Sequence, residues 1–569
     1  MTSPVYSVDA QCRDCYKCVR HCPVKAIRVE NDHAAVNPQT CILCGRCVSV
    51  CGHSAKQVRD DLPRVRTLLR QKKPAYASLA PSFVSEFPGV RPAQLFEALK
   101  RLGFSAVHET AEGAERVSQE LAAQLDRAES GLFLSTACPV AVELITRYHP
   151  AFAAALTPVL PPMLAHARQL KARYGADAPV VFIGPCIGKK RDADNAPDLL
   201  YAALTFEELR RWMILTGIEP AALPDDPGCP EPGSGALYPI EGGMSQTIRR
   251  FLKRRDLDGA LLTVSGLGHI AAMLKTLDPH AAGHPLFLEL LACEGGCIAG
   301  PKATARSTIA AHLDVAAYAQ QASARLPAPA DIAHAWRPDP VETPAFRDDQ
   351  IAGALRALGK YQKEDELNCG GCGYDSCRAL VHAILQGVAE PQMCVSHMRL
   401  LAQKKTSALS RALPYGLVIA DASLRIMECN ERFAKLFGET LATAYESRPG
   451  LRDADLTRIL PFPNLFKSVL ASGHEIIRKS VKLGSRIFSV TIFNVEPRTV
   501  VGALLLDVTD TERRRLQLIE KSRTVIQNTA KTVQEIAFML GKNTAQSELI
   551  LNSAIDMFAA EDADGPEQH

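Results

Sequence analysis

Cysteine spacing constrains this chain of 569 residues more than any other feature. Sixteen of its eighteen cysteines fall into three groups, each with the spacing of iron–sulfur ligands. The first group comprises Cys12, Cys15, Cys18, Cys22, Cys41, Cys44, Cys47 and Cys51. The second comprises Cys138, Cys186, Cys293 and Cys297, and the third comprises Cys369, Cys372, Cys377 and Cys394. A chain that commits so many thiolates to clusters is expected to transfer electrons.

The composition excludes several classes of function. The hydrophobic content is 47%, the charged content is 22% and the formal net charge is +3, as in an ordinary globular protein. The charges form no basic stripe, so we expect no nucleic-acid partner. No apolar stretch approaches the ~20 residues of a membrane span, and the N-terminus resembles no export signal. We therefore expect a cytoplasmic protein without membrane contact, whose cysteines are metal ligands rather than disulfides.

The central part of the sequence predicts a parallel α/β fold. Buried strands are expected at 75–79, 131–134, 180–183, 260–264 and 286–291. Amphipathic helices are expected between them, for example at 92–102 and 163–174. This alternation favours parallel sheets covered by helices. A connecting helix at 61–73 and another at 348–367 flank this part of the chain.

The whole chain is predicted to be multidomain, combining α/β and α+β parts. Five prolines between 326 and 344 indicate a linker. The predicted segments are a cysteine-rich domain at 1–60, an α/β domain at 73–325, the linker at 326–344, a small helical four-cysteine module at 345–400, a mixed domain at 408–510 and a helix at 511–558.

The two N-terminal cysteine runs both follow the pattern C-x2-C-x2-C-x3-C. In bacterial two-cluster ferredoxins with this spacing, the fourth cysteine of each run ligates the cluster of the other run. We therefore expect one [4Fe–4S] cluster on Cys12, Cys15, Cys18 and Cys51, and another on Cys41, Cys44, Cys47 and Cys22. Zinc is the alternative, but it would leave four thiols unused.

The third cysteine group surrounds a glycine-rich turn, Cys369-Gly-Gly-Cys372-Gly-Tyr-Asp-Ser-Cys377, with Cys394 following a predicted helix at 378–386. The glycines let the backbone fold tightly around a cluster and point N–H groups at its sulfurs. This segment resembles the four-cysteine [4Fe–4S] module of several anaerobic redox proteins. A structural zinc knuckle is the alternative.

The middle group follows the predicted strands. Cys138 comes after 131–134, Cys186 after 180–183, and Cys293 and Cys297 after 286–291. Open α/β sheets bind their ligands at the carboxyl ends of strands. Pro139 suits the first turn of a helix whose positive N-terminus would face an anionic cluster.

These three segments resemble, in order, the signature loops of the [FeFe]-hydrogenase large-subunit domain. The resemblance implies that Cys138, Cys186, Cys293 and Cys297 bind a [4Fe–4S] cluster, which Cys297 bridges to a two-iron centre carrying CO, cyanide and a dithiolate. It also implies that Lys189 hydrogen-bonds an iron-bound cyanide, so Lys189 and Cys297 are the expected catalytic residues. With the two other cysteine groups, the resemblance covers about residues 1–400.

The sequence departs from this family at positions that matter for turnover. The family has a proton-relaying cysteine before its first ligand, and this chain has Ala137. Gly184 and Leu291 replace methionines that pack on the two-iron centre, and the third loop is shortened at 298–301. A missing general acid costs about 10²–10⁴-fold in rate. We therefore expect slow or absent hydrogen turnover.

Residues 408–510 resemble a PAS sensor domain. The resemblance rests on the order strand, strand, helix, on Asn-Glu-Arg-Phe at 430–433 and on Asp-Val-Thr-Asp-Thr-Glu at 507–512. Asn430 is a suitable helix N-cap. Neither His474 nor Cys429 is a convincing cofactor ligand, so we expect a PAS domain that relays a signal without a bound group.

The helix at 511–558 has a seven-residue repeat. Ile519, Ile526, Val533 and Leu540 form one seam, and Leu516, Ala530 and Ala537, interrupted by Arg523, form the other. This pattern predicts a short coiled coil and a homodimer. A helix packed on its own protein is the alternative. No kinase, cyclase or DNA-binding motif follows, so any output acts on a separate partner.

Together these features predict a PAS-linked, sensory-type [FeFe]-hydrogenase-like protein, an oxidoreductase of the ferredoxin hydrogenase class with weak activity. Its expected partners are ferredoxin or another electron carrier, hydrogenase maturation proteins and a downstream kinase or phosphatase. One alternative is an ordinary catalytic hydrogenase. The other is a non-enzymatic iron–sulfur protein, similar to the hydrogenase-like proteins of cluster assembly, which binds a cubane but no two-iron centre.

Overall fold

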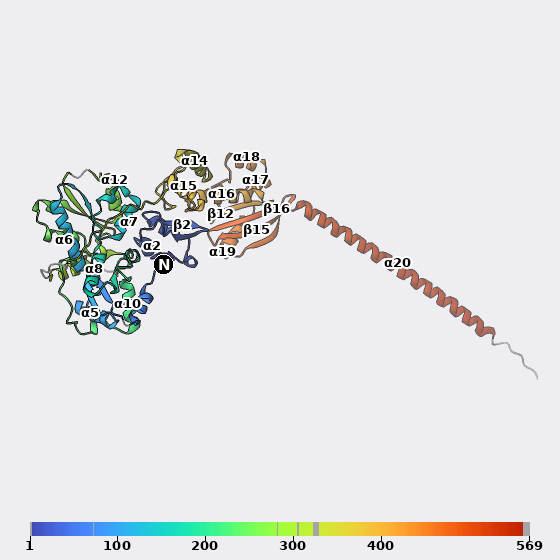
Figure 1. The fold of residues 1–569 in the computed structure, drawn as a ribbon. Helices are drawn as coiled ribbons and strands as arrows, with labels where there is room; N and C mark the ends of the chain where they lie inside the picture. The colour runs from blue at the N-terminus through green and yellow to red at the C-terminus, as the bar shows by residue number, and fades with distance from the viewer. Residues whose placement is uncertain (1–2, 72, 281–282, 304–306, 323–328, 562–569) are drawn as a thin grey trace, which may run out of the picture. The chain divides into compact units, whose positions relative to one another are not determined.

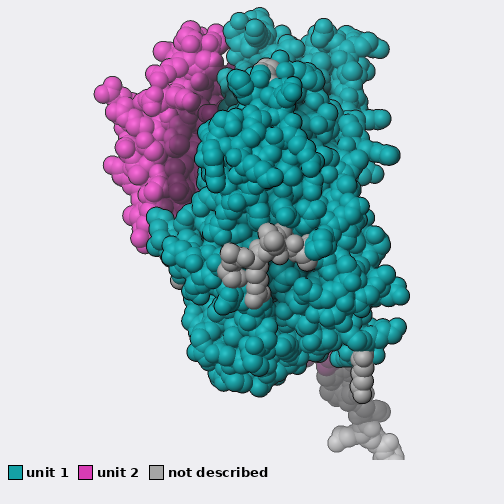
Figure 2. Space-filling view, turned by 60° about the vertical axis from the view of Figure 1, so that its left-hand side comes forward, with its two compact units in different colours: residues 1–398 teal, residues 399–569 magenta. Residues whose placement is uncertain are grey.

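The computed structural model describes residues 3–71, 73–280, 283–303, 307–322 and 329–561. It divides into two compact units, Met1–Met398 and Arg399–His569, which are coloured separately in Figure 2. Residues 326–328 of the predicted linker lie outside the described residues. Among the described helices, none is both long and apolar enough to span a membrane.

The N-terminal cysteine runs are held by two short helices and two antiparallel strand pairs. Strands β1 (Val5–Ser7) and β4 (Lys56–Val58) pair, as do β2 (Ile27–Glu30) and β3 (His33–Val36). Helices α1 (Lys17–His21) and α2 (Arg46–Val50) pack against each other. Each helix carries one run's third cysteine, Cys18 or Cys47. The buried core of this region consists largely of cysteines and small apolar side chains, as expected where clusters replace side-chain volume.

The central region contains two parallel sheets. The first has the strand order β6-β5-β8-β9, and the second has the order β10-β11-β7. This confirms the predicted parallel α/β architecture. The strands are β5 (Tyr76–Leu79), β6 (Ala106–Glu109), β7 (Gly131–Leu134), β8 (Val180–Gly184), β9 (Ala202–Thr205), β10 (Leu261–Ser265) and β11 (Pro285–Leu291). The sequence did not indicate β6 and β9, because each is a four-residue strand directly followed by a helix or helical turn.

Amphipathic helices cover these sheets, and Phe83, Phe96, Phe206 and Phe287 are among the largest fully buried side chains of their cores. The helices are α3 (Leu62–Arg70), α4 (Phe83–Glu86), α5 (Pro92–Arg101), α6 (Ala111–Arg127), α7 (Pro139–Tyr148), α8 (Pro162–Tyr174), α9 (Lys189–Asn195), α10 (Phe206–Thr216), α11 (Gly243–Phe251), α12 (Leu267–Thr276) and α13 (Thr308–Ala319). Pro139 begins α7, as the sequence predicted.

The described part of the predicted linker lies along the α/β region. The backbone N–H of Leu160 donates to the carbonyl of Ile332, and the Trp336 indole donates to the Thr157 carbonyl at 3.1 Å. Ile332 is buried. Residues 329–344 therefore form an extended strap, because apolar residues among the prolines anchor it to the α/β region.

The third cysteine group lies between α14 (Asp348–Ala357) and α16 (Val395–Ala412), on either side of α15 (Cys377–Leu385). The helix predicted over 348–367 is wrong in its second half. It ends at Ala357, because Gly359 adopts the left-handed conformation at φ 76°. The module packs on the N-terminal domain, where the backbone N–H of Val29 donates to the Val388 carbonyl.

The second unit contains a five-stranded antiparallel sheet with the order β13-β12-β16-β15-β14. Its strands are β12 (Gly416–Asp421), β13 (Ile426–Cys429), β14 (Ile476–Leu483), β15 (Arg486–Glu496) and β16 (Val500–Asp507). Helices α17 (Glu431–Leu436), α18 (Glu439–Ser447) and α19 (Pro463–Ser472) accompany it. Asn430 caps α17 as predicted, accepting the N–H of Phe433 at 2.9 Å. The sequence did not indicate β14, whose charged residues are exposed.

The last element is the 53-residue helix α20 (Thr509–Glu561), which begins with Thr509 hydrogen-bonded to Asp507. It runs slightly further in both directions than the predicted 511–558. In Figure 1 it continues as one straight rod after β16. Its apolar side chains, including Ile519, Ile526, Val533 and Leu540, are exposed.

Candidate metal centre

The loops after three strands of the α/β region meet at one cavity. Cys138 follows β7, Cys186 follows β8, and Cys297 lies in the loop after β11. All three line a cavity of about 90 Å³. Strand β8 belongs to one sheet while β7 and β11 belong to the other, so the cavity lies where the carboxyl ends of the two sheets meet.

Cys293, the fourth predicted ligand, is half-buried and is not one of the residues that line this cavity. The negative charges of Cys138, Cys186 and Cys297 add to the effect of burial in raising the pKa of the Cys293 thiol. Burial raises the pKa of Cys186 to about 11 and that of Cys297 to about 12. Thiols in such surroundings become thiolates when a metal replaces the proton. The structure therefore brings the four predicted ligands together in an environment suited to metal ligation.

The spacing of the cysteines does not suit a single zinc ion. Zn–S bonds of about 2.3 Å place tetrahedral sulfur ligands about 3.8 Å apart. Within the described residues, three metal-binding side chains with their ligand atoms within 4.8 Å of one another occur only at Cys12, Asp14 and His33. None of the predicted sets of four cysteines is this compact. A larger multi-iron cluster fits this wider arrangement better than zinc does.

Lys189, to which the resemblance drew attention, lines the cavity. Its ammonium donates to the Asp192 carboxylate at 3.1 Å and to the Ala137 carbonyl at 3.2 Å. Burial lowers the pKa of Lys189, but Asp192 and Cys186 raise it by more. Lys189 therefore carries a positive charge beside the cysteines.

Ser82 provides a second polar contact that the sequence did not reveal. Its hydroxyl is buried, it lines the cavity and it has no hydrogen-bond partner. A buried hydroxyl without a partner is costly unless a ligand accepts its proton. Together with the cation of Lys189, it fits an anionic ligand in the cavity. The residues present therefore fit a metal group that carries anionic ligands such as cyanide.

The departures from the family are visible in the cavity wall. Ala137 and Leu291 both line the cavity. A side chain at Gly184 would meet the Phe182 ring at 2.7 Å, and Phe182 itself lines the cavity. The space beside Gly184 is thus filled by an aromatic ring. Met163, which the sequence analysis did not single out, also contributes to the wall.

Cys22 of the first N-terminal run lies near Cys41, Cys44 and Cys47 of the second run. Burial raises the pKa of Cys44 to about 12, and the charges of Cys22 and Cys41 add to this effect. Cys22 also raises the pKa of Cys47. Backbone N–H groups point at the sulfurs, from Ala26 to Cys22 at 3.1 Å and from Leu43 to Cys41 at 3.3 Å. This arrangement supports the predicted grouping of Cys22 with the cysteines of the second run.

The set containing Cys44 adjoins the central cavity. Cys44 is among the charges that raise the pKa of Cys293. A side chain at Gly45 would lie 2.5 Å from Pro301 and 2.7 Å from Ile187, so the two loops touch through a glycine. This close approach places the second N-terminal cluster set next to the central cysteines.

The same set also adjoins the third cysteine group. Burial raises the pKa of Tyr374 to about 12, with contributions from Cys372 on one side and Cys22 on the other. Gly373 abuts Arg20, which donates to the Gly371 carbonyl at 3.5 Å. The set Cys22, Cys41, Cys44 and Cys47 therefore lies between the third group and the central cavity.

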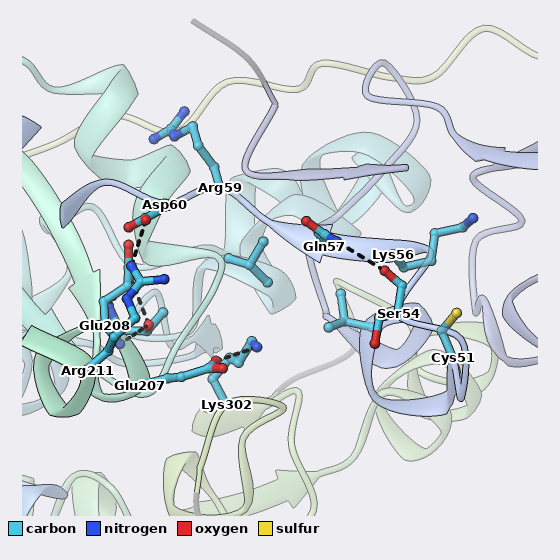
Figure 3. A pocket seen from close by; sticks show the side chains of 13 residues that line it. Cys51, Ser54, Lys56, Gln57, Arg59, Asp60, Glu207, Glu208, Arg211 and Lys302 are labelled. Atoms are coloured by element: carbon cyan, nitrogen blue, oxygen red, sulfur yellow. Dashed lines mark hydrogen bonds and ion pairs between the residues drawn. The ribbon is translucent and has the colours of Figure 1, made fainter. Parts of the chain in front are cut away.

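A polar cleft of about 490 Å³ marks the junction between the N-terminal domain and the α/β region (Figure 3). Cys51 lines one end of it, and ion pairs between Arg211 and Asp60 and between Lys302 and Glu207 line the other. Arg59 also lines the cleft and donates to Asp194 at 2.8 Å and 2.9 Å. These charges are paired with each other, so the ion pairs hold the N-terminal domain and the α/β region together.

Among its described residues the second unit has no set of cysteines like the central one, because Cys429 is its single cysteine. Cys429 is buried in its core, and His474 lies in the turn after α19. No group of three metal-binding side chains occurs among its described residues.

Four family models match separate parts of the chain. Residues 73–301 match "Iron only hydrogenase large subunit, C-terminal domain", and residues 4–52 match "4Fe-4S dicluster domain". Residues 365–396 match "Putative Fe-S cluster", and residues 405–475 match "PAS domain". No curated protein matches the chain.

Solved structures resemble single parts of the chain. A variant of the [FeFe]-hydrogenase HydA1 from Chlamydomonas reinhardtii is 20% identical over 46% of this chain and 90% of its own, with a TM-score of 0.38. The PAS domain of an HTR-like protein from Haloarcula marismortui is 23% identical over 19% of this chain and 95% of its own, with a TM-score of 0.15.

Residues 73–301 therefore belong to the family of the iron-only hydrogenase large subunit, C-terminal domain, in a chain that also carries a 4Fe-4S dicluster domain, a further iron–sulfur module and a PAS domain.

Proposed function

We propose that this protein senses hydrogen, or the redox state of an electron pool, at its central cysteine site. Cys138, Cys186, Cys293 and Cys297 would hold a [4Fe–4S] cluster, and Cys297 would bridge it to a two-iron centre. When bound, that centre supplies the site at which hydrogen is split or formed. The observation that carries the proposal is the meeting of three of these cysteines, the Lys189 cation and the unpartnered Ser82 hydroxyl at one cavity.

A sensory role is favoured over fast catalysis by two features of the chain. Ala137 places a methyl group at the cavity wall where a proton-transferring group would serve turnover. The PAS domain and α20 add a module that no electron-transfer reaction requires. A change of cluster charge would bias a two-state element, and the PAS domain and α20 would report it.

One observation favours a different candidate, a non-enzymatic iron–sulfur protein with a cubane alone. The cavity is small, and Phe182 lies in its wall beside Gly184. A site that binds no two-iron centre needs no larger space. The two candidates differ in the spectrum of the mature protein.

Infrared spectroscopy of protein produced with hydrogenase maturation proteins separates these candidates. We expect bands from iron-bound CO and cyanide in the wild-type chain. The bands should disappear in Cys297→Ser, because the bridging thiolate is lost. Cys229→Ser is the matched control, since Cys229 belongs to none of the three groups, and it should keep the bands. An iron–sulfur signal without such bands in the wild type would refute the two-iron centre.

We further propose that α20 dimerises through its exposed seam. The side chains of Ile519, Ile526, Val533 and Leu540 are between 41% and 67% exposed in the single chain. Burying one such side chain contributes about 1.5–3 kcal/mol, so a coiled coil between two copies removes a substantial cost.

Light scattering of the purified chain should therefore give the mass of a dimer. The double variant Ile526→Asp with Val533→Asp should be monomeric, because two carboxylates would be buried in the seam. Thr524→Asp with Thr532→Asp adds the same charges away from the seam and should remain dimeric. A monomeric wild type, or equal masses for both variants, would contradict a dimer held by this seam.

A further inference from the structure

A chain of buried polar groups leads away from the central cavity. Thr110 lines the cavity, and its hydroxyl lies 2.8 Å from the hydroxyl of Ser78. The Ser78 hydroxyl in turn lies 2.8 Å from Nδ1 of His166. The three residues come from the loop after β6, from β5 and from α8. Ser78 and His166 are fully buried, and Thr110 is 5% exposed.

The second ring nitrogen of His166 has no hydrogen-bond partner. Its Nε2 atom is buried and makes no hydrogen bond. The His108 ring stands edge-on to the His166 ring, with the ring centroids 6.3 Å apart. His108 lies 3.6 Å from the Glu112 carboxylate and 2.9 Å from the Tyr174 hydroxyl. Tyr174 is 37% exposed, so this outer group reaches the surface.

Packing alone does not account for this chain. Apolar side chains of the α/β core, such as Ala77, Leu79 and Ala165, neighbour these groups in sequence, and an aliphatic side chain in place of each polar group would avoid its desolvation cost. A structural histidine in a core has both ring nitrogens satisfied, whereas Nε2 of His166 has no partner and the His108 ring packs beside the His166 ring. The arrangement connects a cavity to a surface group through hydrogen-bonding atoms that can both give and receive protons.

We propose that Thr110, Ser78 and His166 form a proton relay between the surface group His108, Glu112 and Tyr174 and the central cavity. This inference rests on the proposed function, in which protons are released or consumed in that cavity. Each hydroxyl accepts one proton and passes on its own. His166 accepts a proton at one ring nitrogen and releases another from the opposite nitrogen. The net transfer is one proton and no electron, and bulk water is the source or the sink. A water molecule between the two histidine rings would complete the outer step.

The environment of His166 makes this relay slow. Burial lowers the pKa of His166 to about 4; Glu112 opposes this effect, while His108 and Arg173 add to it. The ring is therefore neutral at pH 7, and only about one molecule in 10³ carries the extra proton. A relay of this kind serves a sensor that equilibrates slowly, and it uses residues other than Ala137, where the resemblance places the cysteine of the family.

The test uses the full chain and three variants. Ser78→Ala removes the middle hydroxyl, and His166→Gln keeps a hydrogen-bonding group that exchanges protons poorly. Thr247→Val is the control, because Thr247 is an equally buried hydroxyl that donates to the Ser234 and Gly243 carbonyls elsewhere in the same region. Infrared bands of CO and cyanide report whether the site is loaded, and hydrogen turnover at pH 7 reports the relay.

We expect Ser78→Ala and His166→Gln to keep the bands but lose at least about tenfold in turnover, with a larger solvent deuterium isotope effect. Thr247→Val should keep both the bands and the turnover. Unchanged turnover in the two relay variants with intact bands would overturn the relay. Absence of the bands from the wild type would instead overturn the proposed function.

Nitrogen NMR supplies a readout that needs no two-iron centre. In ¹⁵N-histidine-labelled protein made without maturation proteins, the signals missing from His166→Gln identify the ring. We expect a neutral ring down to about pH 5 whose Nδ1 shift changes in Ser78→Ala. A ring that titrates like an exposed histidine, or one that is insensitive to Ser78→Ala, would show that the hydrogen-bonded chain does not exist.

Discussion

Replacing Ala137 with cysteine is expected to raise the hydrogen turnover of the matured protein by about 10²-fold. Ala137 lines the central cavity, and its carbonyl accepts a hydrogen bond from Lys189 at 3.2 Å. A side chain at this position therefore lies at the cavity wall, while its backbone stays fixed by the lysine. A thiol there can both donate and accept a proton, which a methyl group cannot do.

The matched control for this experiment is Ala137→Ser. Serine adds a side chain of similar size whose hydroxyl loses its proton far less readily, so it should gain much less than cysteine. The infrared bands must be equally strong in all three proteins, since otherwise the rates would report loading. If Ala137→Cys leaves the rate unchanged at equal loading, proton transfer at this wall does not limit turnover.

We expect the effect of Ala137→Cys on turnover to be coupled to the effect of substitutions in the proposed relay. If protons reach the cavity through Ser78 and His166 in the natural chain, the cysteine opens a second route at another point of the wall. The loss caused by His166→Gln should then be smaller in the Ala137→Cys background than in the wild-type background. Two variants that act independently would instead multiply their effects on the rate.

The strands and the cysteines that follow them could be predicted from the sequence because both are local features. Cysteine spacing groups the N-terminal and the third sets of thiols, and apolar runs of four to six residues locate the strands after which Cys138 and Cys186 lie. The coordinates add that these strands belong to two sheets. A pattern of apolar runs does not show which strands pair with one another, so the division into two sheets could not be predicted from the sequence.

The polar lining of the site could not be predicted, because it depends on contacts between distant segments. Ser78 and His166 are 88 residues apart in sequence. The helix predicted at 163–174 placed His166 only on an amphipathic helix, with no indication of its partner. No sequence signal pointed to Ser82 either, since a serine after a buried strand is most often a turn residue.

Two neighbouring lysines also show that the environment of a side chain could not be predicted from the sequence. Lys189 and Lys190 follow each other in sequence, and the resemblance drew attention only to the first. In the fold their side chains enter different environments. Lys189 faces the cavity, whereas Lys190 enters the core between α9, α10 and the segment before α3, where it is 0% exposed. Lys189 is thus a candidate functional residue, whereas Lys190 is a candidate stabilising residue.

Replacing Lys190 with methionine is accordingly expected to destabilise the α/β region by about 3–5 kcal/mol. The Lys190 ammonium donates to Asp61 at 2.9 Å, to both oxygens of Glu208 at 2.9 Å and 3.0 Å, and to the Ala203 carbonyl at 3.1 Å. Methionine has a similar length but no charge, so two buried carboxylates would lose their shared cation. For a region of this size the loss corresponds to a fall in melting temperature of about 10 °C.

Lys189→Met is the matched control, since its main partner Asp192 is 20% exposed and can be hydrated. It should change the melting temperature by much less while weakening the infrared signature of the central site. Thermal unfolding followed by circular dichroism, with iron content measured in parallel, distinguishes the two outcomes. Adding Glu208→Gln to Lys190→Met should recover part of the lost stability, because one uncompensated buried charge is removed. Equal melting temperatures for the two single variants would mean that Asp61 and Glu208 are held by other partners, with Lys190 adding little to the junction.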